Sequence, residues 1–395
     1  MIIETLRLRD FRNYAQFEMK PHPGVNLLFG QNGSGKTNLL EAVHYCALGR
    51  SHRTAQDMEV VRKGAEAAAC GVTVKTAGGT REIALRLTPG EGKHKQVFVD
   101  RKRAARLASL MGQVQCVMFS PEDLQLIKEG PSERRAFLDM MLSQLSPSYF
   151  VALQQYRKAL DQRNAILRDC RKFGRPLPAM TEDFERQMAR AASAILPTRR
   201  KAAERLERIA AEKYAAISGK TAEALGLRYQ PCLPEAAESE DAQEIERAFL
   251  KACRDAREED LRRGTSSFGA HREDLLFTLM GREMKLFASQ GQIRTAVLSV
   301  KLAQMEIDRE ESGECPVLLL DDVMSELDRP RRTHLLREIT GAQTFVTCTD
   351  ESDLDGCEDR RVYYVSQSRE GLAEVREVRA GEAVPEESLE EPDFS

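Results

Sequence analysis

The chain has 395 residues, 42% of them hydrophobic and 31% charged, a balance typical of a globular protein with two or three domains. No apolar run approaches the ~18–20 residues of a membrane span, and the N-terminal MIIETLRLRDFRNY alternates like a strand, unlike a signal peptide. The nine cysteines are scattered and form no C-x-x-C motif, so we expect a cytoplasmic protein without zinc. The net charge is −3, so any DNA contacts are expected to come from local basic clusters.

Alternating apolar residues predict two strands within residues 1–20. The apolar run Val25–Phe29 then predicts a buried strand of a parallel sheet, and a helical pattern follows that stops at Gly49. Between strand and helix the chain carries G-x-x-x-x-G-K-T, the pattern of a phosphate-binding loop. The residues of this loop are Gly30, Gln31, Asn32, Gly33, Ser34, Gly35, Lys36 and Thr37.

Each residue type in this loop suits the binding of ATP. The glycines permit backbone torsions and a close approach that a Cβ would block, so that N–H groups face an anion. We expect Lys36 to reach the β- and γ-phosphates and the Thr37 hydroxyl to ligate Mg²⁺. A plain tight turn would not require four small residues followed by Lys-Thr, so the sequence predicts a site for ATP and Mg²⁺.

Period-two alternation from about residue 66 to 100 predicts an antiparallel meander beside the parallel core. Six basic residues gather near its end, opposed only by Asp100. They are Lys93, Lys95, Arg101, Lys102, Arg103 and Arg106. Such a cluster can follow the phosphate backbone of DNA, but charge can equally protect a solvated edge strand, and the sequence leaves both readings open.

An apolar strand is predicted at residues 114–119, followed by a helix start at residues 120–123. From about residue 131 to 264 apolar residues recur at steps of three, four and seven, which predicts antiparallel helices or a short coiled coil. Pro197 is expected to kink or interrupt the second helix. The basic turn at residues 171–178 is either solvated or a contact with DNA or a partner.

After Gly264 the mixed pattern returns, and residues 274–280 and 283–288 are predicted to form a hairpin. A helix is predicted to begin directly after it. The residues at its start combine a hydroxyl, a glycine backbone and a positive helix end, which is a second phosphate-binding design. These residues are Ser289, Gln290, Gly291 and Gln292. An ordinary helix cap explains Ser289 equally well when it is taken alone.

Four apolar residues, Val317–Leu320, predict a buried strand that ends in Asp321 and Asp322. We expect Asp321 to hold Mg²⁺ opposite Thr37, and Asp322 to orient or deprotonate the attacking water. Ser289 lies only 32 residues before Asp321. Because one ATP rarely needs two phosphate cradles from one chain, we expect the Ser289 segment to close over ATP that a second copy holds.

This order of P-loop, helical insertion, signature and acidic strand is that of ATP-binding-cassette proteins. Within that group the chain resembles the RecF family of SMC-related ATPases, from the N-terminus to about residue 350. The stretches that carry the resemblance are LRLRDFRNY (6–14), GQNGSGKTN (30–38), GRSHRT (49–54), FSPEDLQLIKEGPSERRAFLD (119–139), HREDL (271–275), FASQGQ (287–292) and LLLDDVMSELD (318–328).

The resemblance implies ATP-dependent homodimerisation and binding of single-stranded or gapped DNA. It also implies a role in recombinational repair and replication-fork maintenance, loading recombinase at gaps together with the partner mediator RecR. Since most cassette ATPases have Glu at the position of Asp322, we expect a weak, DNA-stimulated ATPase whose slow hydrolysis releases DNA. The glutamine of the usual Mg²⁺-sensing loop is not identified, and Gln113 and Gln115 are its candidates.

We therefore predict an α/β fold with an ATP-binding-cassette head, made of a P-loop mixed sheet and an antiparallel meander, and an inserted α-helical arm with a short coiled coil. The expected parts are the N-terminal head (1–130), the arm (131–264), the C-terminal head (265–380) and a disordered acidic tail (381–395).

Three other functions stay open. A transporter subunit is disfavoured because 253 residues separate Lys36 from Ser289, far more than a compact insertion. A nuclease or helicase is disfavoured because no metal constellation is visible beyond His271, Glu273 and Asp274. The sequence does not exclude a structural clamp that never hydrolyses its ATP.

Overall fold

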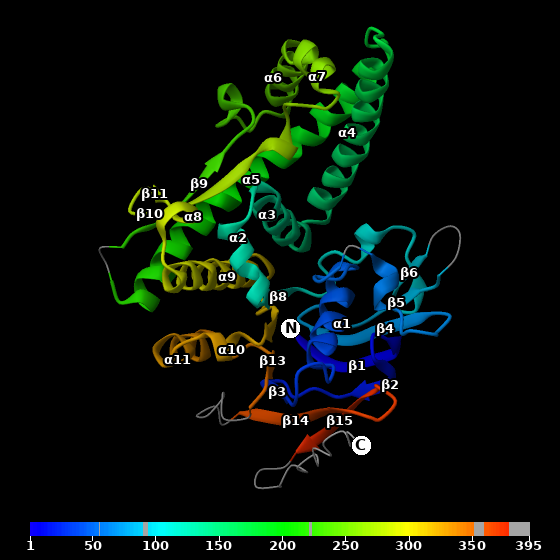
Figure 1. Cartoon of the computed structure of the whole chain (residues 1–395), viewed down its shortest axis with the longest axis vertical. Helices are drawn as coiled ribbons and strands as arrows, with labels where there is room; N and C mark the ends of the chain where they lie inside the picture. The colour runs from blue at the N-terminus through cyan, green and yellow to red at the C-terminus, as the bar shows by residue number, and fades with distance from the viewer. Residues whose placement is uncertain (55, 90–93, 221–222, 351–358, 379–395) are drawn as a thin grey trace, which may run out of the picture.

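The computed structural model describes the whole chain except residues 55, 90–93, 221–222, 351–358 and 379–395, so the predicted acidic tail lies outside the described residues. Figure 1 shows two bodies: a head that contains two sheets and both ends of the chain, and a helical arm that extends away from it. The prediction of a cassette-type head with an inserted arm is confirmed.

A six-stranded mixed sheet forms the centre of the head. Its strands, in spatial order, are β15 (Ala373–Val378), β14 (Arg360–Gln367), β3 (Val25–Phe29), β13 (Thr344–Cys348), β12 (Val317–Asp321) and β8 (Cys116–Phe119). All neighbours are parallel except β14 and β15. Every residue of β3, β8, β12 and β13 is buried, which explains why the sequence shows these strands as continuous apolar runs.

The predicted meander is an antiparallel sheet at the other side of the head. Its strands, in spatial order, are β2 (Tyr14–Met19), β1 (Ile2–Phe11), β4 (Ala68–Thr76), β5 (Gly79–Leu87), β6 (Lys95–Val99) and β7 (Lys102–Arg103). Helix α1 (Lys36–Leu48) contacts strands of both sheets and is buried along most of its length. The helix that carries the P-loop residues is therefore held between two layers.

Helices cover the other face of the mixed sheet. They are α9 (Gln290–Ser312), which supplies Leu298, Leu302 and Met305, and α11 (Arg329–Glu338), which supplies Leu335. Residues of β12 alternate between the two faces: Leu318 and Leu320 face these helices, while Leu319 belongs to the core around α1. The short helices α2 (Gln125–Lys128), α8 (Met284–Phe287) and α10 (Val323–Glu326) complete the head.

The arm consists of α3 (Pro131–Leu145), α4 (Pro147–Phe173), α5 (Thr181–Ser218), α6 (Ala242–Asp255) and α7 (Arg257–Arg263). The residues whose spacing predicted helix packing are buried: Tyr149, Leu153, Tyr156, Leu160 and Leu167 on α4, and Met188, Ile195, Ala202 and Ile209 on α5. Helix α5 also packs on α9, so the arm is fixed to the head along a helix of the mixed-sheet layer.

Two expectations about the arm and the segment that follows it were wrong. Residues Leu225–Gln230, predicted as part of a helical stretch, form β9, which pairs with β10 (Asp274–Leu279) and the short β11 (Arg282–Glu283) in a separate three-stranded sheet. The second strand predicted over residues 283–288 is mostly helix α8. Leu225, Leu227 and Tyr229 alternate as in a strand, but the segment is only six residues long and its pairing partner follows some fifty residues later, so the surrounding helical pattern hid it.

Pro197 does not interrupt α5, which runs from Thr181 to Ser218 with the proline inside it. A proline removes one hydrogen bond of the helical ladder and crowds the preceding turn. Here Ile195 and Leu196 before it, and Arg199 and Ala202 after it, are all buried. Tertiary packing on both sides of the proline therefore maintains the helix.

A buried arginine joins three helices of the arm. Arg163 on α4 is 1% exposed, and it donates hydrogen bonds to Glu185 of α5 at 3.1 Å and to Asp260 of α7 at 2.7 Å. Glu185 and Asp260 are buried as well. Removing the arginine would leave the buried Asp260 without a positive partner and Glu185 with only Arg257, at 2.8 Å, and such an uncompensated buried charge is costly.

We predict that Arg163→Ala lowers the free energy of unfolding of the arm by ~3–5 kcal/mol, because it breaks a buried ion-pair network. Urea unfolding followed by helical circular dichroism measures the loss. The matched control is Arg186→Ala on α5, whose ion pairs with Glu182 and Asp183 are solvent-exposed, and which should cost below ~1 kcal/mol. Equal losses for the two variants would contradict the prediction.

Candidate nucleotide site

At two positions of the loop between β3 and α1, only glycine can adopt the observed backbone conformation. Gly30 has φ 145°, and a Cβ there would lie 2.1 Å from the carbonyl oxygen of Val365. Gly35 has φ 121°, and a Cβ there would lie 2.9 Å from the side chain of Asn13. The loop therefore passes so close to β14 and to the β1–β2 turn that any side chain would move it.

Lys36 and Thr37 begin α1 and lie against different groups. The Lys36 ammonium donates to the carbonyl oxygens of Gly30 at 2.5 Å and Gln31 at 2.8 Å, so its side chain lies over the loop. Burial lowers the pKa of Lys36, and the carboxylates of Asp321 and Asp322 partly oppose that effect. Thr37 Oγ1 donates to Asp321 Oδ1 at 2.8 Å, which joins the P-loop to a strand 284 residues later.

The acidic pair lies where β12 ends. Asp321 Oδ1 accepts a second hydrogen bond, from Thr347 Oγ1 at 2.7 Å, and Thr347 Oγ1 in turn accepts the backbone N–H of Asp322 at 2.9 Å. Asp322 itself has φ 52° and ψ 23°, a left-handed conformation that is uncommon outside glycine. Strained backbone of this kind clusters at functional sites. The turn aims Asp322 into the same space as Asp321.

These residues surround a pocket of about 260 Å³. Its walls contain predicted residues from the P-loop together with Asp321 and Asp322. Three further residues of the wall, Asn38, Arg53 and Thr347, were given no role by the sequence reasoning. Thr347 lies near the end of β13, and the position of β13 beside the P-loop strand is decided by strand pairing that no local pattern records. Arg53 belongs to the GRSHRT motif, and its guanidinium donates to Asn38 Oδ1 at 3.1 Å.

A buried carboxylate ties two of the family motifs to helix α1. Glu41 is fully buried and accepts hydrogen bonds from Arg12 at 2.6 and 2.8 Å and from Ser51. Burial by itself would raise the pKa of Glu41, but the hydrogen bonds from Arg12 and Ser51 outweigh it and lower the pKa below its usual value. Glu41 therefore stays ionised and holds the loop that carries Arg53 beside the pocket.

The predicted signature does not line this pocket. Ser289 is the N-cap of α9: its hydroxyl accepts the Gln292 N–H at 3.3 Å, while Gln292 Oε1 accepts the Ser289 N–H at 2.9 Å. Ser289 and Gln290 are exposed, and Gly291 and Gln292 half-buried. The local explanation of Ser289 as a cap is thus correct, and the segment remains accessible to another molecule.

The basic cluster near the meander is less uniform than its sequence suggested. Lys93 lies outside the described residues. Lys95 forms an ion pair with Asp57 at 2.6 Å, and Arg101 one with Glu82 at 2.8 Å. Lys102 and Arg103 of β7 are exposed, as is Arg106. Lys95 therefore belongs to the packing of the sheet, while Arg101, Lys102, Arg103 and Arg106 face solvent.

Neither candidate for the Mg²⁺-sensing glutamine lies near the acidic pair. Strand β8 runs parallel to β12 with Cys116 opposite Val317 and Phe119 opposite Leu320. Gln113 and Gln115 precede Cys116, so they lie at the opposite end of the sheet from Asp321, roughly 16 Å away for Gln115 and farther for Gln113 at ~3.3 Å per residue. The direction of the strand excludes both.

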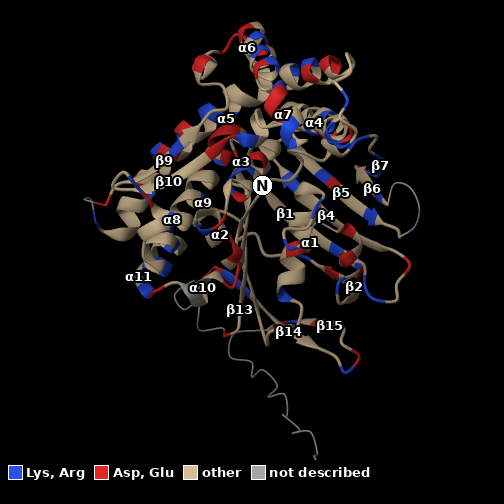
Figure 2. Ribbon diagram, turned by 45° about the horizontal axis from the view of Figure 1, so that its top comes forward, with Lys and Arg blue, Asp and Glu red and all other residues tan. Residues whose placement is uncertain are grey.

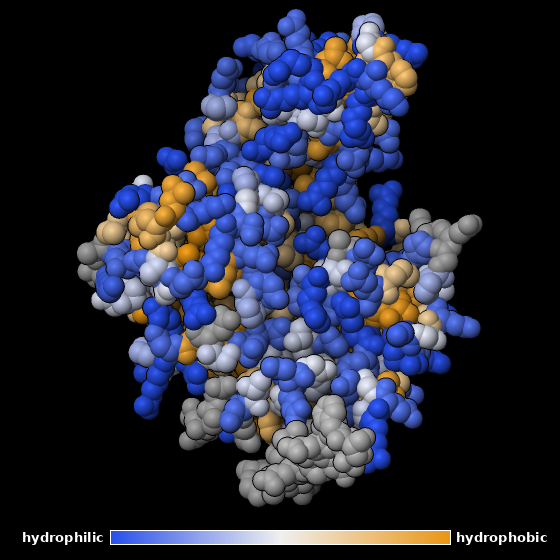
Figure 3. Space-filling model, viewed as in Figure 1, coloured by the Kyte–Doolittle hydropathy of each residue, from blue (hydrophilic) through white to orange (hydrophobic). Residues whose placement is uncertain are grey.

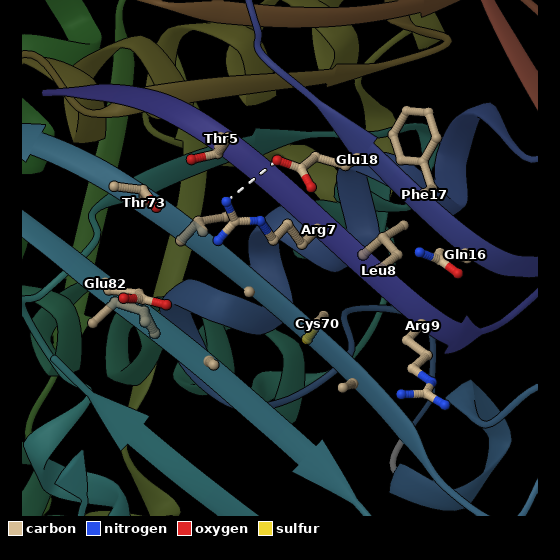
Figure 4. A pocket seen from close by; sticks show the side chains of 15 residues that line it. Thr5, Arg7, Leu8, Arg9, Gln16, Phe17, Glu18, Cys70, Thr73 and Glu82 are labelled. Atoms are coloured by element: carbon tan, nitrogen blue, oxygen red, sulfur yellow. Dashed lines mark hydrogen bonds and ion pairs between the residues drawn. The ribbon is translucent and has the colours of Figure 1, made fainter. Parts of the chain in front are cut away.

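A separate hollow of about 640 Å³ lies on the outer face of the antiparallel sheet. Figure 4 shows it crossing β1, β4 and β5, with Arg7 ion-paired to Glu18 at its edge. Its floor is formed by residues with small side chains, such as Ala69, Gly71 and Ala84. No P-loop or acidic-pair residue lines it, so it is distinct from the pocket between β3 and β12.

The pocket beside the P-loop fits a nucleoside triphosphate with a divalent cation. Its loop is shaped by glycines, and the buried Ser34 Oγ has no hydrogen-bond partner among the described residues. One hydroxyl, Thr37, and one carboxylate, Asp321, meet at 2.8 Å, and oxygen ligands of these two kinds suit Mg²⁺. An ammonium at Lys36 and a guanidinium at Arg53 supply positive charge for phosphate oxygens.

Known proteins of similar sequence share this arrangement along most of their length. A family model described as "RecF/RecN/SMC N terminal domain" matches residues 2–374. The DNA replication and repair protein RecF of Acetivibrio thermocellus is 40% identical over 351 residues, which cover 89% of this chain and 94% of that protein. RecF of Symbiobacterium thermophilum is 40% identical over 359 residues, covering 90% and 93%.

Solved structures agree with the sequence comparison. Two structures of the recombination mediator protein RecF in the RecFOR pathway, described as RecF-ATP and RecF-ATPrS, have TM-scores of 0.86 at 31% and 32% identity. They cover 96% and 95% of this chain, and each is itself covered to 98%. An Smc head bound to the C-winged helix domain of ScpA has a TM-score of 0.55 at 15% identity, covering 96% of this chain and 98% of that one, a likeness of fold alone.

We predict that Thr347→Val weakens magnesium-dependent nucleotide binding about tenfold. The substitution removes the hydroxyl that holds Asp321 and the Asp322 N–H, and hydrogen bonds to charged groups contribute ~1.5–3 kcal/mol each. Titration with a fluorescent ATP analogue, with and without Mg²⁺, measures the effect. Thr347→Ser keeps the hydroxyl and should bind like the wild type; equal affinity of the valine variant would show that Thr347 has no part in the site.

Proposed function

The chain belongs to the RecF family of SMC-related ATPases, and from this premise we propose that it is an ATP-dependent DNA-binding protein of recombinational repair and replication. The single observation that carries the proposal is the hydrogen bond of 2.8 Å between Thr37 and Asp321, two residues that are 284 positions apart in the sequence. Through it both ends of the chain build one nucleotide site. The long insertion between them supplies the arm, for which we keep the boundaries 131 and 264.

In this proposal ATP and Mg²⁺ bind at the P-loop pocket. The ion supplies positive charge that stabilises the phosphates. Thr37 and Asp321 hold it, and Thr347 keeps Asp321 in position. Lys36 exchanges its hydrogen bonds to the Gly30 and Gln31 carbonyls for bonds to phosphate oxygens. The ammonium needs to move little, because both carbonyls belong to the loop that holds the phosphates.

Asp322 is the group we assign to the attacking water. Its left-handed backbone and the bond from its N–H to Thr347 fix the turn, and Ser325 Oγ donates to its carboxylate at 3.1 Å. A carboxylate next to the phosphate site can orient or deprotonate water. Aspartate is one methylene shorter than the glutamate of most cassette ATPases, so we propose slow hydrolysis that acts as a release step.

Dimerisation places the signature of one copy over the ATP of the other. Ser289 and Gln290 are exposed and absent from the pocket of their own chain. Beside them Leu286 is 79% exposed and Met280 55% exposed, and Figure 3 shows the apolar patch over β10, β11 and α8. Exposed apolar patches of this kind mark protein contacts. ATP then acts as a switch, because it binds the dimer better than the monomer.

DNA and a RecR-type mediator are the partners that this family membership implies. We propose single-stranded or gapped duplex DNA as the ligand, clamped when two heads close. Similarity to structures described as the recombination mediator protein RecF in the RecFOR pathway supports a role in that pathway. Among the described residues no helix has the length and apolarity needed to cross a membrane.

The side chains that a nuclease would need as metal ligands, His271, Glu273 and Asp274, are already bound to other groups of the protein. Glu273 is ion-paired with Arg199 at 2.6 Å, and Asp274 with Arg134 at 2.7 Å. His271 is hydrogen-bonded to Tyr156 and to a backbone carbonyl. All three candidate ligands are engaged by the protein itself, so they serve the packing of the arm.

We predict that the protein sediments as a dimer only with ATP and Mg²⁺, and that gapped DNA strengthens the dimer. Ser289→Arg and Lys36→Met should remain monomeric, the first because it blocks the signature and the second because it weakens phosphate binding. Ser193→Arg on α5 adds the same charge away from the signature and should dimerise normally. A Ser289→Arg protein that dimerises like the wild type would rule out the action of the signature in trans.

We further predict opposite changes at Asp322. Asp322→Asn should slow single-turnover hydrolysis about 10²-fold or more, since the general base is lost, while Asp322→Glu should accelerate it. Both variants should bind ATP like the wild type. Unchanged single-turnover rates in both would remove Asp322 from the hydrolytic step.

A further inference from the structure

A second polar pocket lies at the base of the arm, away from the nucleotide. It has a volume of about 220 Å³. Three elements contribute to it: α3, the early turns of α4, and the segment around His271, with Arg199 of α5 behind them. Its polar lining residues are Ser132, Arg135, Asp139, Tyr156, Arg157, Arg199 and His271. Two motifs that the ATP site does not use, PSERRAFLD and HREDL, meet here.

Asp139 is the one acidic residue among those that line the pocket. Its carboxylate accepts Arg157 at 2.9 Å and Arg199 at 2.8 Å, together with the Tyr149 hydroxyl at 2.5 Å. Arg199 is 2% exposed and has a second partner in Glu273, at 2.6 Å. One carboxylate therefore already serves two arginines before any further cation is considered.

Two more arginines have no ion pair of their own among the described residues: Arg135, which lines this pocket, and Arg50, which lines a neighbouring one. Arg135 donates to the backbone carbonyl of Glu273 at 2.7 Å. Arg50, from the GRSHRT motif, reaches only the sulfur of Met140 at 3.7 Å. Burial lowers the pKa of Arg135, and the charge of Arg199 lowers it further; burial and then Arg157 lower the pKa of Arg50. The pocket has an excess of positive charge.

His271 does not add to that excess. Its ring nitrogens are bonded to the Tyr156 hydroxyl at 2.9 Å and to the Ser266 carbonyl at 3.1 Å. Burial lowers the pKa of His271 to about 4. The ring is neutral at physiological pH and contributes hydrogen bonds and shape, so the charge comes from arginine alone.

We propose that this arm-base pocket binds a phosphate group of the DNA backbone. The inference rests on the proposed function and names the residues that contact the DNA. Arginine forks match the oxygens of phosphate, and Ser132 in the first turn of α3 adds a hydroxyl near a positive helix end. The site is open, since the Arg157 side chain is 55% exposed and Ser132 is exposed as well.

A neighbouring basic feature favours a polymer over a single acidic group. Helix α4 contacts the 3-10 turn Leu107–Ser109, which directly follows Arg106 and the exposed pair Lys102 and Arg103. On α6 and α7, by contrast, Figure 2 shows Lys and Arg interspersed with Asp and Glu. Each strand of a DNA duplex carries a negative charge every ~3.4 Å of the axis, so one strand can place a phosphate in the pocket and further phosphates beside Lys102, Arg103 and Arg106.

The test compares Arg157→Gln and Arg135→Gln with the matched control Arg208→Gln, an exposed arginine of α5 whose ion-pair partner is Glu212. Binding of a fluorescein-labelled gapped duplex is measured with ATP and Mg²⁺ over a range of salt concentrations. Each pocket variant should bind about 3–10-fold more weakly, and the slope of log K against log salt should fall by ~0.9. Nucleotide affinity should not change, and Arg208→Gln should match the wild type.

Each failure is distinguishable. If the wild type binds no DNA, the proposed function and the DNA assignment fail together. If the wild type binds DNA and Arg157→Gln has the same affinity and salt slope, only the arm-base pocket is wrong, whether or not Arg135→Gln folds. If inorganic phosphate raises the melting temperature of the wild type but not of Arg157→Gln, while both bind DNA equally, the ligand is free phosphate and the DNA assignment is overturned.

Discussion

The parallel register of β3, β13 and β12 is the constraint on which the rest of the molecule depends. It brings the carboxyl ends of three strands to one edge, where Thr37, Thr347 and Asp321 meet within hydrogen-bond distance. These residues come from widely separated parts of the chain, so the site exists only when the whole head has formed. The arm is an insertion in the chain between two groups of strands that form one sheet. Any motion of α9, which covers that sheet and contacts α5, is thereby connected to the arm.

Buried arginines give the arm its fixed geometry. Arg163 joins α4, α5 and α7, Arg199 joins α5 to α3 and to Glu273, and Arg134 joins α3 to Asp274 at the start of β10. Buried ion pairs contribute little net stability compared with apolar packing, but a broken pair is costly, so alternative packings of the helices are disfavoured. Arg199 also lines the arm-base pocket, where three arginines lie around a single lining carboxylate, Asp139.

Ser289 illustrates how a structural and a functional reading of one residue coexist. Within the protomer its hydroxyl caps α9 through a reciprocal bond with Gln292. The reciprocal cap uses the N–H groups of Ser289 and Gln292. It leaves the N–H groups of Gln290 and Gly291 in the first helical turn, where no intrahelical acceptor is available, so the start of the helix can still present them to a ligand from outside. The cap makes the signature rigid, and rigidity suits a surface that closes over a phosphate.

The sequence by itself determined the features that local chemistry dictates: the P-loop between strand and helix, the buried strands that read as apolar runs, the acidic pair after β12 and the helices of the arm. Only the tertiary structure decided the rest. Strand β9 was missed because its partner β10 is distant in sequence, and Gln113 and Gln115 were excluded by the direction of β8. Thr347, Arg53 and the arm-base pocket likewise became visible only in three dimensions. Each of these groups acts through contacts with residues that are distant in sequence. The periodicity of one segment contains no information about which other segments lie next to it in space.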